Sequence, residues 1–274
     1  MNNFLLNNGV EIPEIGFGTA KMEHIDCQSV VAEAIRAGYR HIDTASIYQT
    51  EEGVGRAMAH SGLARRDFFI TTKAWRTEMG YDNVLRAFEQ SLQRLGTDYV
   101  DLYLLHWPLP SGDYQDWKAL DRESWKAVER LYDQGCARAI GVSNFLVHHL
   151  ENLFVHANVM PMANQIEFHP GYTQWDTVQF CQANHIRMEA WSPLARQRMA
   201  GEGLLVELAE KYGVSTSQLC IKFALQCGVI PLPKSADSLR MRQNLAVDFT
   251  ISPEDLARIH AMPLTGWSGL HPDK

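Results

Sequence analysis

Short apolar segments alternate with segments of helical periodicity along almost the whole chain. The expected strands are residues 15–18, 41–43, 68–73, 100–107, 137–143, 162–168, 187–192 and 229–233. The segments with helical spacing of apolar residues are 26–37, 83–95, 121–134, 147–156, 176–183, 202–212 and 217–226. This repetition within 274 residues predicts an α/β protein with the strand count of a (β/α)8 TIM barrel. A doubly wound sheet has the same periodicity and remains the alternative.

The two ends of the chain carry additional elements. Residues 4–12 read as an N-terminal β-hairpin with Asn7-Asn8-Gly9 as its turn. Residues 253–261 read as a last helix with Ser252 as its N-cap. The Gly- and Pro-containing C-terminal loop that follows includes Trp267, so we expect it to pack over one mouth of the barrel. No repeat or linker divides residues 1–274, which predicts a single domain.

Composition excludes several classes of protein. The net charge of −7 argues against general nucleic-acid binding, which needs clustered Lys and Arg. No secretory signal is visible, and every apolar run is much shorter than the roughly 20 residues of a membrane span. The five cysteines include no C-x-x-C pair, which predicts free thiols in the cytoplasm. The eleven histidines include no H-x-H or H-E-x-x-H pattern, so no metal site is expected.

Four polar residues lie at or just past the ends of expected strands: Asp43, Tyr48, Lys73 and His106. Each alone has an ordinary structural interpretation, such as a turn cap, a surface ring, an exposed lysine or a core histidine. Together they favour proton transfer, because a lysine about 4 Å from a tyrosine stabilises the phenolate by about 4 kcal/mol at an effective dielectric of about 20. That energy lowers the tyrosine pKa by up to about 3 units. Asp43 would keep Lys73 charged, and His106 would orient a carbonyl substrate.

Two glycines near the start of the chain resemble the beginning of a Rossmann dinucleotide-binding motif. Gly16-Phe17-Gly18 follows a strand, as in a Rossmann fingerprint. The third glycine position is occupied by Lys21, and the helix is expected only near Asp26. A Rossmann site is therefore not expected here.

Several motifs together resemble the aldo-keto reductase superfamily. These motifs are GYRHIDTA at 38–45 with Tyr48 and Glu51, TTK at 71–73, LLHWP at 104–108, IGVSNF at 140–145, and LPKS with Arg240 and Asn244. The size and short tail look most like the bacterial 2,5-diketo-D-gluconate reductase branch. The resemblance implies a (β/α)8 barrel, usually monomeric, that binds NADPH without a Rossmann domain. It also implies that Tyr48 is the proton donor.

The resemblance assigns further residues to the cofactor. Ser143, Asn144 and Gln165 would hold the nicotinamide carboxamide, although Ser143-Asn144 could also cap a helix that begins at Phe145. Trp191 would stack on the nicotinamide ring. The remaining assignments are Thr19 as a cofactor contact, Ser192 and Leu194 in the pyrophosphate loop, Lys234, Ser235 and Arg240 at the 2′-phosphate, and Gln243 and Asn244 at the adenine.

The substrate pocket departs from the family pattern at one position. Ala20 stands where relatives usually carry an aromatic residue, which implies a wider pocket mouth. Trp75, Trp107 and His106 would form its walls, with Met22 beside them.

The leading hypothesis from the sequence is an NADPH-dependent reductase of small aldehydes and ketones. Candidate substrates are 2,5-diketo-D-gluconate, methylglyoxal and other dicarbonyls. One alternative is a slow NADPH-binding sensor or regulatory subunit on the same fold. Another is a lyase that forms a Schiff base on Lys73, but that chemistry needs a neutral amine and Asp43 favours the charged one.

Overall fold

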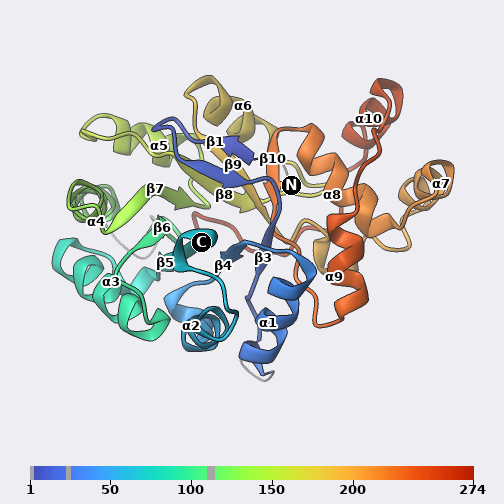
Figure 1. The fold of residues 1–274 in the computed structure, drawn as a ribbon. Helices are drawn as coiled ribbons and strands as arrows, with labels where there is room; N and C mark the ends of the chain where they lie inside the picture. The colour runs from blue at the N-terminus through green and yellow to red at the C-terminus, as the bar shows by residue number, and fades with distance from the viewer. Residues whose placement is uncertain (1–2, 23–25, 110–114) are drawn as a thin grey trace.

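The computed structural model describes residues 3–22, 26–109 and 115–274. Within them, eight parallel strands form one sheet in the order β10-β9-β8-β7-β6-β5-β4-β3. Figure 1 shows these strands at the centre of the molecule, with helices arranged around the outside. The strands are β3 (Gly16–Gly18), β4 (His41–Asp43), β5 (Phe69–Ala74), β6 (Val100–Leu105), β7 (Ala137–Ser143), β8 (Ala163–Glu167), β9 (Arg187–Trp191) and β10 (Val229–Pro231). The predicted (β/α)8 barrel is confirmed.

A backbone hydrogen bond joins the first and last strands of the sheet. The amide of Gly18, at the end of β3, donates to the carbonyl of Pro233, just past β10, over 3.2 Å. A Cβ at Gly18 would lie 3.1 Å from the carbonyl oxygen of Leu232, so a residue without a side chain suits this approach. The glycine that imitated a Rossmann motif therefore serves barrel closure.

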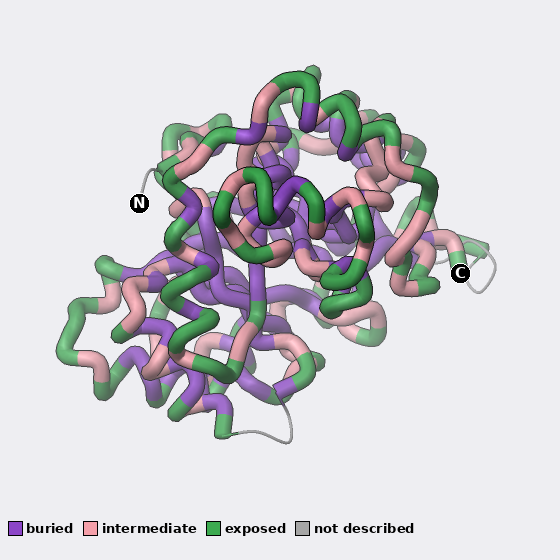
Figure 2. Tube along the Cα trace, turned by 90° about the vertical axis from the view of Figure 1, so that its right-hand side faces the viewer, coloured by how far each residue is buried: buried purple, intermediate pink, exposed green. Residues whose placement is uncertain are grey.

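Apolar residues fill the space inside the barrel and between strands and helices. All six residues of β5 and all six of β6 are buried, as expected for strands covered on both faces. Figure 2 shows buried chain in the interior and exposed chain mainly on the outer turns. Burial of apolar surface stabilises such a fold by about 25 cal/mol per Å².

The first helix illustrates how the sequence sets its boundaries. The carboxylate of Asp26 accepts a hydrogen bond from the amide of Ser29 and caps α1 (Cys27–Ala37). Val30, Val31, Ala34 and Ile35 face the core at helical spacing. Gly38 ends the helix with a φ of 115°, a conformation that glycine adopts without steric cost.

The other helices agree with most of the sequence-based expectations. They are α2 (Glu51–Ala59), α3 (Tyr81–Leu95), α4 (Trp117–Asp133), α5 (Val147–Phe154), α6 (Trp175–Ala183), α7 (Gly203–Tyr212), α8 (Thr216–Gln226), α9 (Ser238–Leu245) and α10 (Pro253–His260). Short 3₁₀ helices are η1 (Ser46–Tyr48), η2 (Arg65–Asp67), η3 (Arg76–Glu78) and η4 (Ala195–Gln197). The helices α2 and α9 were not predicted from the sequence, and α4 begins four residues before the predicted segment.

Both predicted terminal elements are present. β1 (Asn3–Leu5) and β2 (Glu11–Pro13) pair antiparallel, with Gly9 at a φ of 85° in the turn. The C-terminal loop contacts the end of β8, where Ser268 donates its amide and its hydroxyl to the carboxylate of Glu167. The ring of Trp267 stacks on Tyr172 with centroids 6.0 Å apart. The loop is therefore packed at the C-terminal mouth of the barrel.

None of the helices in the described residues is both long and apolar enough to cross a membrane.

Candidate active site at the C-terminal mouth of the barrel

The strand register brings the four proton-handling candidates to one end of the barrel. Asp43 is the last residue of β4 and pairs with Thr71 of β5, and Lys73 lies two residues further along the same strand. Lys73 in turn pairs with Leu104 of β6, and His106 directly follows that strand. Carboxyl ends of parallel strands are where barrels place their chemistry. The order of the strands thus places the three side chains next to one another.

Lys73 is fully buried and is held by two acceptors. Its Nζ donates to Asp43 Oδ1 over 2.7 Å and to the carbonyl of Thr44 over 2.8 Å. Burial acts to lower the pKa of Lys73, but Asp43, with Tyr48 and Glu189, raises that pKa above its usual value. Lys73 therefore remains an ammonium, which opposes the Schiff-base alternative.

Tyr48 lies between this ammonium and a neutral histidine. Lys73 Nζ is 5.1 Å from the centroid of the Tyr48 ring, and the Tyr48 hydroxyl is 3.1 Å from His106 Nε2. Burial, followed by the charges of Lys73 and Arg76, holds the pKa of His106 well below its usual value. His106 is accordingly neutral at physiological pH and offers Nε2 beside the phenol.

The net pKa of Tyr48 corrects the expectation from the sequence. Lys73 lowers this pKa, as reasoned, and contributes by its charge and by hydrogen bonding. Burial raises it by more, and Asp43 adds to the rise, so the pKa lies above its usual value of 10.0. In this structure the phenol therefore keeps its proton at neutral pH, and Lys73 limits the cost of losing it.

A second carboxylate anchors the turn that carries Tyr48. Ser46, at the start of η1, donates its hydroxyl to Glu78 Oε2 over 2.6 Å, and the amide of Trp75 donates to the same oxygen over 2.6 Å. This shared acceptor ties the turn after β4 to the turn after β5. The position of the phenol is therefore set by both loops.

Glu189 lies deeper in the barrel and was missed in the sequence analysis. Gln165 Nε2 donates to Asp43 Oδ2 over 2.9 Å and to Glu189 Oε2 over 3.2 Å. Burial and then the charge of Asp43 raise the pKa of Glu189 to about 8. Glu189 is therefore protonated at neutral pH. A charged residue type in the middle of the apolar strand RMEAW was the signal that could have identified it.

The residues assigned to the nicotinamide carboxamide lie together and bond to one another. Ser143 Oγ donates to the carbonyl of Gln165, and Asn144 Nδ2 donates to Ser143 Oγ and to the carbonyl of His106. Trp191 Nε1 donates to Asn144 Oδ1 over 2.7 Å, which fixes the indole orientation. Because both protons of Gln165 Nε2 are engaged, its Oε1 is the atom of this side chain suited to accept from an external amide.

The alternative role of Ser143-Asn144 as a helix cap is wrong. α5 begins at Val147, and its N-cap is Leu146. Asn144 instead has a φ of 63°, which is uncommon for a residue other than glycine. Such strained backbone is found preferentially at functional sites.

The loop after β9 contains a run of left-handed residues. Ser192, Ala195, Arg196 and Gln197 have φ values of 50°, 46°, 54° and 65°. Successive amides in such conformations can form concavities that bind anions. The loop that contains Ser192 and Leu194 thus has an uncommon backbone conformation, and its role at the pyrophosphate stays a prediction.

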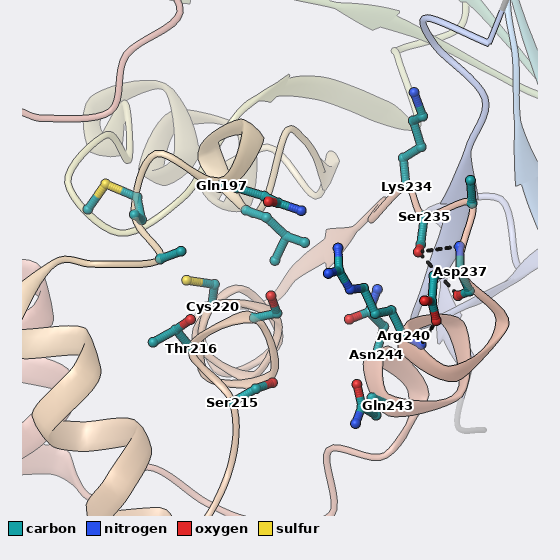
Figure 3. Close-up of a pocket in the computed structure, with 15 residues that line it drawn as sticks. Gln197, Ser215, Thr216, Cys220, Lys234, Ser235, Asp237, Arg240, Gln243 and Asn244 are labelled. Carbon is teal, nitrogen blue, oxygen red and sulfur yellow. Dashed lines mark hydrogen bonds between the residues drawn. The ribbon is translucent and has the colours of Figure 1, made fainter. Parts of the chain in front are cut away.

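A pocket of about 680 Å³ adjoins this loop and extends to α9. Figure 3 shows its lining side chains, which come from the segments around Gln197, Cys220 and Arg240. All the residues assigned to the 2′-phosphate and the adenine line it: Lys234, Ser235, Arg240, Gln243 and Asn244. Leu194 lines it too. Asp237 and Thr216 also line it, and neither was predicted from the sequence to belong to the site.

Lys234 does not face the other phosphate candidates. Its Nζ donates to the carbonyl of Lys21 over 2.9 Å, and Figure 3 shows the side chain extended away from Arg240. Ser235 Oγ is engaged with the backbone of Asp237. The expected clamp is therefore only partly assembled.

Of the expected substrate walls, Trp75 is the one that contacts His106. The Trp75 ring contacts His106 edge-on with centroids 5.0 Å apart, and the Trp107 ring lies 6.4 Å from Trp191. Met22 is fully buried, and Ala20 is partly exposed.

Thr19 supports the catalytic strand. Both its amide and its Oγ1 donate to the carbonyl of Asp43, and Oγ1 lies 3.1 Å from Thr50 Oγ1. Thr19 is fully buried, so it holds the end of β4 in place.

Comparisons with known proteins agree with this geometry. The family model described as "Aldo/keto reductase family" matches residues 14–205 and 203–263. Glyoxal reductase of Bacillus subtilis is 45% identical over 271 residues, which are 98% of this chain and 95% of that protein. Methylglyoxal reductase DkgA of Salmonella typhimurium is 37% identical, covering 98% of this chain and 96% of that protein.

Solved structures are similar over the same length. An aldo/keto reductase from Brucella melitensis has a TM-score of 0.88 at 43% identity, over 94% of this chain and 98% of that one. A Bombyx mori aldo-keto reductase in complex with NADP has a TM-score of 0.87 at 33% identity, over 99% and 98% of the two chains. The chain belongs to the aldo/keto reductase family.

Proposed function

We propose that the protein is an NADPH-dependent reductase that converts small aldehydes and ketones to alcohols. The observation that carries this proposal is Tyr48, placed between a buried ammonium and a neutral imidazole. Among relatives of similar length, two are named glyoxal reductase and methylglyoxal reductase, and one similar structure contains NADP.

The residues present fit a nicotinamide dinucleotide. Gln165 Oε1 and Asn144 Oδ1 are acceptors for a primary amide, and the Trp191 indole is oriented by its bond to Asn144. Arg240 at the far pocket supplies a cation for phosphate. We assign Ser143, Asn144, Gln165 and Trp191 to the nicotinamide, Thr19 to the same end of the site, and the loop with Ser192 and Leu194 to the pyrophosphate. Lys234, Ser235, Arg240, Gln243 and Asn244 are assigned to the adenosine end.

When bound, a nicotinamide dinucleotide would supply the hydride for the carbonyl carbon. Tyr48 donates its proton to the carbonyl oxygen, and Lys73 stabilises the phenolate that remains. Asp43 keeps Lys73 charged and fixed, so the cation is in place before the proton moves. Neutral His106 forms a hydrogen bond with the Tyr48 hydroxyl and orients the substrate oxygen beside it.

We propose that the substrates are compact carbonyl compounds, with dicarbonyls among them. Ala20 stands where the family usually carries an aromatic residue, and we propose that its small side chain widens the mouth of the substrate pocket. The similarity to relatives named for glyoxal and methylglyoxal supports the same class. The 2,5-diketo-D-gluconate branch remains a prediction.

A steady-state assay of NADPH oxidation tests the proposal. Methylglyoxal, glyoxal, 2,5-diketo-D-gluconate and a simple aldehyde are compared with a sample that lacks substrate. Turnover with at least one carbonyl is expected. NADPH binding without turnover on any of them would support the sensor alternative instead. Substrate trapped on Lys73 by borohydride would revive the Schiff-base alternative.

We propose that the protein is a monomer, as the resemblance to the family implies. Sedimentation velocity in the range of assay concentrations would test that proposal.

A further inference from the structure

A carboxylate lies inside the pocket assigned to the adenosine end of the cofactor. Asp237 lines this pocket together with Lys234, Ser235 and Arg240. Its Oδ1 accepts the amide of Leu239 over 2.8 Å and the amide of Arg240 over 2.9 Å, so it caps α9. Figure 3 shows Asp237 directly beside Ser235. The first free amides of α9 are therefore already bonded to a carboxylate.

Other polar groups of this pocket are likewise engaged in hydrogen bonds within the protein. Ser235 Oγ donates to the carbonyl of Asp237 over 3.2 Å and accepts its amide over 3.0 Å. Lys234 Nζ is directed to the carbonyl of Lys21. The hydrogen bond from the Arg240 amide, then that from the Leu239 amide and the charges of Arg240 and Arg242, hold the pKa of Asp237 below its usual value.

A 2′-phosphate and a 2′-hydroxyl respond in opposite ways to such a carboxylate. A phosphate dianion is repelled by the charge of Asp237 and cannot use amides that Asp237 occupies. A ribose hydroxyl can donate to the carboxylate, as acidic residues do for NAD in other nucleotide folds. The carboxylate of Asp237 therefore weakens the binding of NADPH and strengthens the binding of NADH.

We propose that Asp237 sets the dinucleotide preference of this site, weakening 2′-phosphate binding and accepting the 2′-hydroxyl, so that the protein binds NADH as well as NADPH. This inference rests on the proposed function, because it concerns the cofactor of the same active site.

The test is equilibrium binding of NADP⁺ and NAD⁺ to wild type and to Asp237→Asn. Asparagine caps a helix as well as aspartate does, so α9 stays intact while the charge is removed. We expect the dissociation constant for NADP⁺ to fall about tenfold at low salt, and that for NAD⁺ to stay constant or rise. The gain for NADP⁺ should shrink as ionic strength increases. In wild type the two constants should differ by less than about a hundredfold.

The matched control is Asp133→Asn, which removes the same charge from an exposed position at the end of α4. It should leave both constants unchanged. An unchanged ratio of the two constants in Asp237→Asn, or a wild type that does not bind NAD⁺, would overturn the inference while leaving the proposed function intact. Failure of wild type to bind either dinucleotide would overturn both.

Discussion

The ion pair between Asp43 and Lys73 should be worth several kcal/mol, and a double-mutant cycle can measure it. The two side chains are only 5% and 0% exposed, with Nζ and Oδ1 2.7 Å apart. Removal of one partner from a buried pair leaves the other charge uncompensated and costs about 3–5 kcal/mol. Asp43→Asn and Lys73→Met should each lower the free energy of unfolding by that amount. The double variant should lose much less than the sum of the two.

Urea denaturation followed by tryptophan fluorescence at neutral pH measures the four free energies of unfolding. The control cycle uses Glu123→Gln and Lys126→Met, because that pair has the same 2.7 Å separation but is about half exposed. Its coupling free energy should be below about 0.5 kcal/mol. A coupling free energy for Asp43 and Lys73 as small as that of the control would refute the claim that Asp43 holds a buried charge in place.

Two further predictions concern stability. Glu189→Gln should flatten the pH dependence of unfolding, because the pKa of about 8 in the folded state exceeds the usual value of 4.5. The folded protein therefore binds more protons than the unfolded chain and loses stability as pH rises between those values. At pH 7 the variant should gain up to about 3 kcal/mol, and parallel stability curves for variant and wild type would contradict this account. Gly55→Ala should destabilise by about 1–3 kcal/mol in thermal unfolding, since a Cβ there would lie 2.4 Å from the carbonyl oxygen of Leu95. Gly203→Ala, in open space, is its control and should cost nothing, and equal effects of the two substitutions would count against the packing argument.

Much of the fold followed from the sequence because its signals are local. Apolar runs such as 100–105 identify buried strands, and polar residues at their ends identify the mouth of a barrel. The helix α2 was missed because its buried face includes Glu51, which accepts hydrogen bonds from Thr72 and Arg94 that no periodicity reveals. Charged residues in that segment gave no apolar pattern to detect.

The candidate site was less predictable where three-dimensional surroundings decide the outcome. Lys73 does lower the pKa of Tyr48, but only the structure shows that burial raises this pKa by more than Lys73 lowers it. Lys234 is a reasonable phosphate ligand by residue type, yet its amine contacts the carbonyl of Lys21. Asp237 was not predicted to belong to the site, because an aspartate that caps a helix is common. The structure shows that it lines the same pocket as Arg240. A sequence gives the type of each residue, but it does not give the direction of a side chain or the sum of the effects that shift its pKa.

The central claim is that the phenol of residue 48 delivers a proton to the substrate. Tyr48→Phe keeps the ring and removes only the hydroxyl, so the most direct measurement is its turnover number at saturating NADPH with a dicarbonyl substrate. We expect a loss of about 10²–10⁴-fold, the usual contribution of a positioned acid, with the affinity for NADPH retained. Turnover equal to that of wild type would contradict the account.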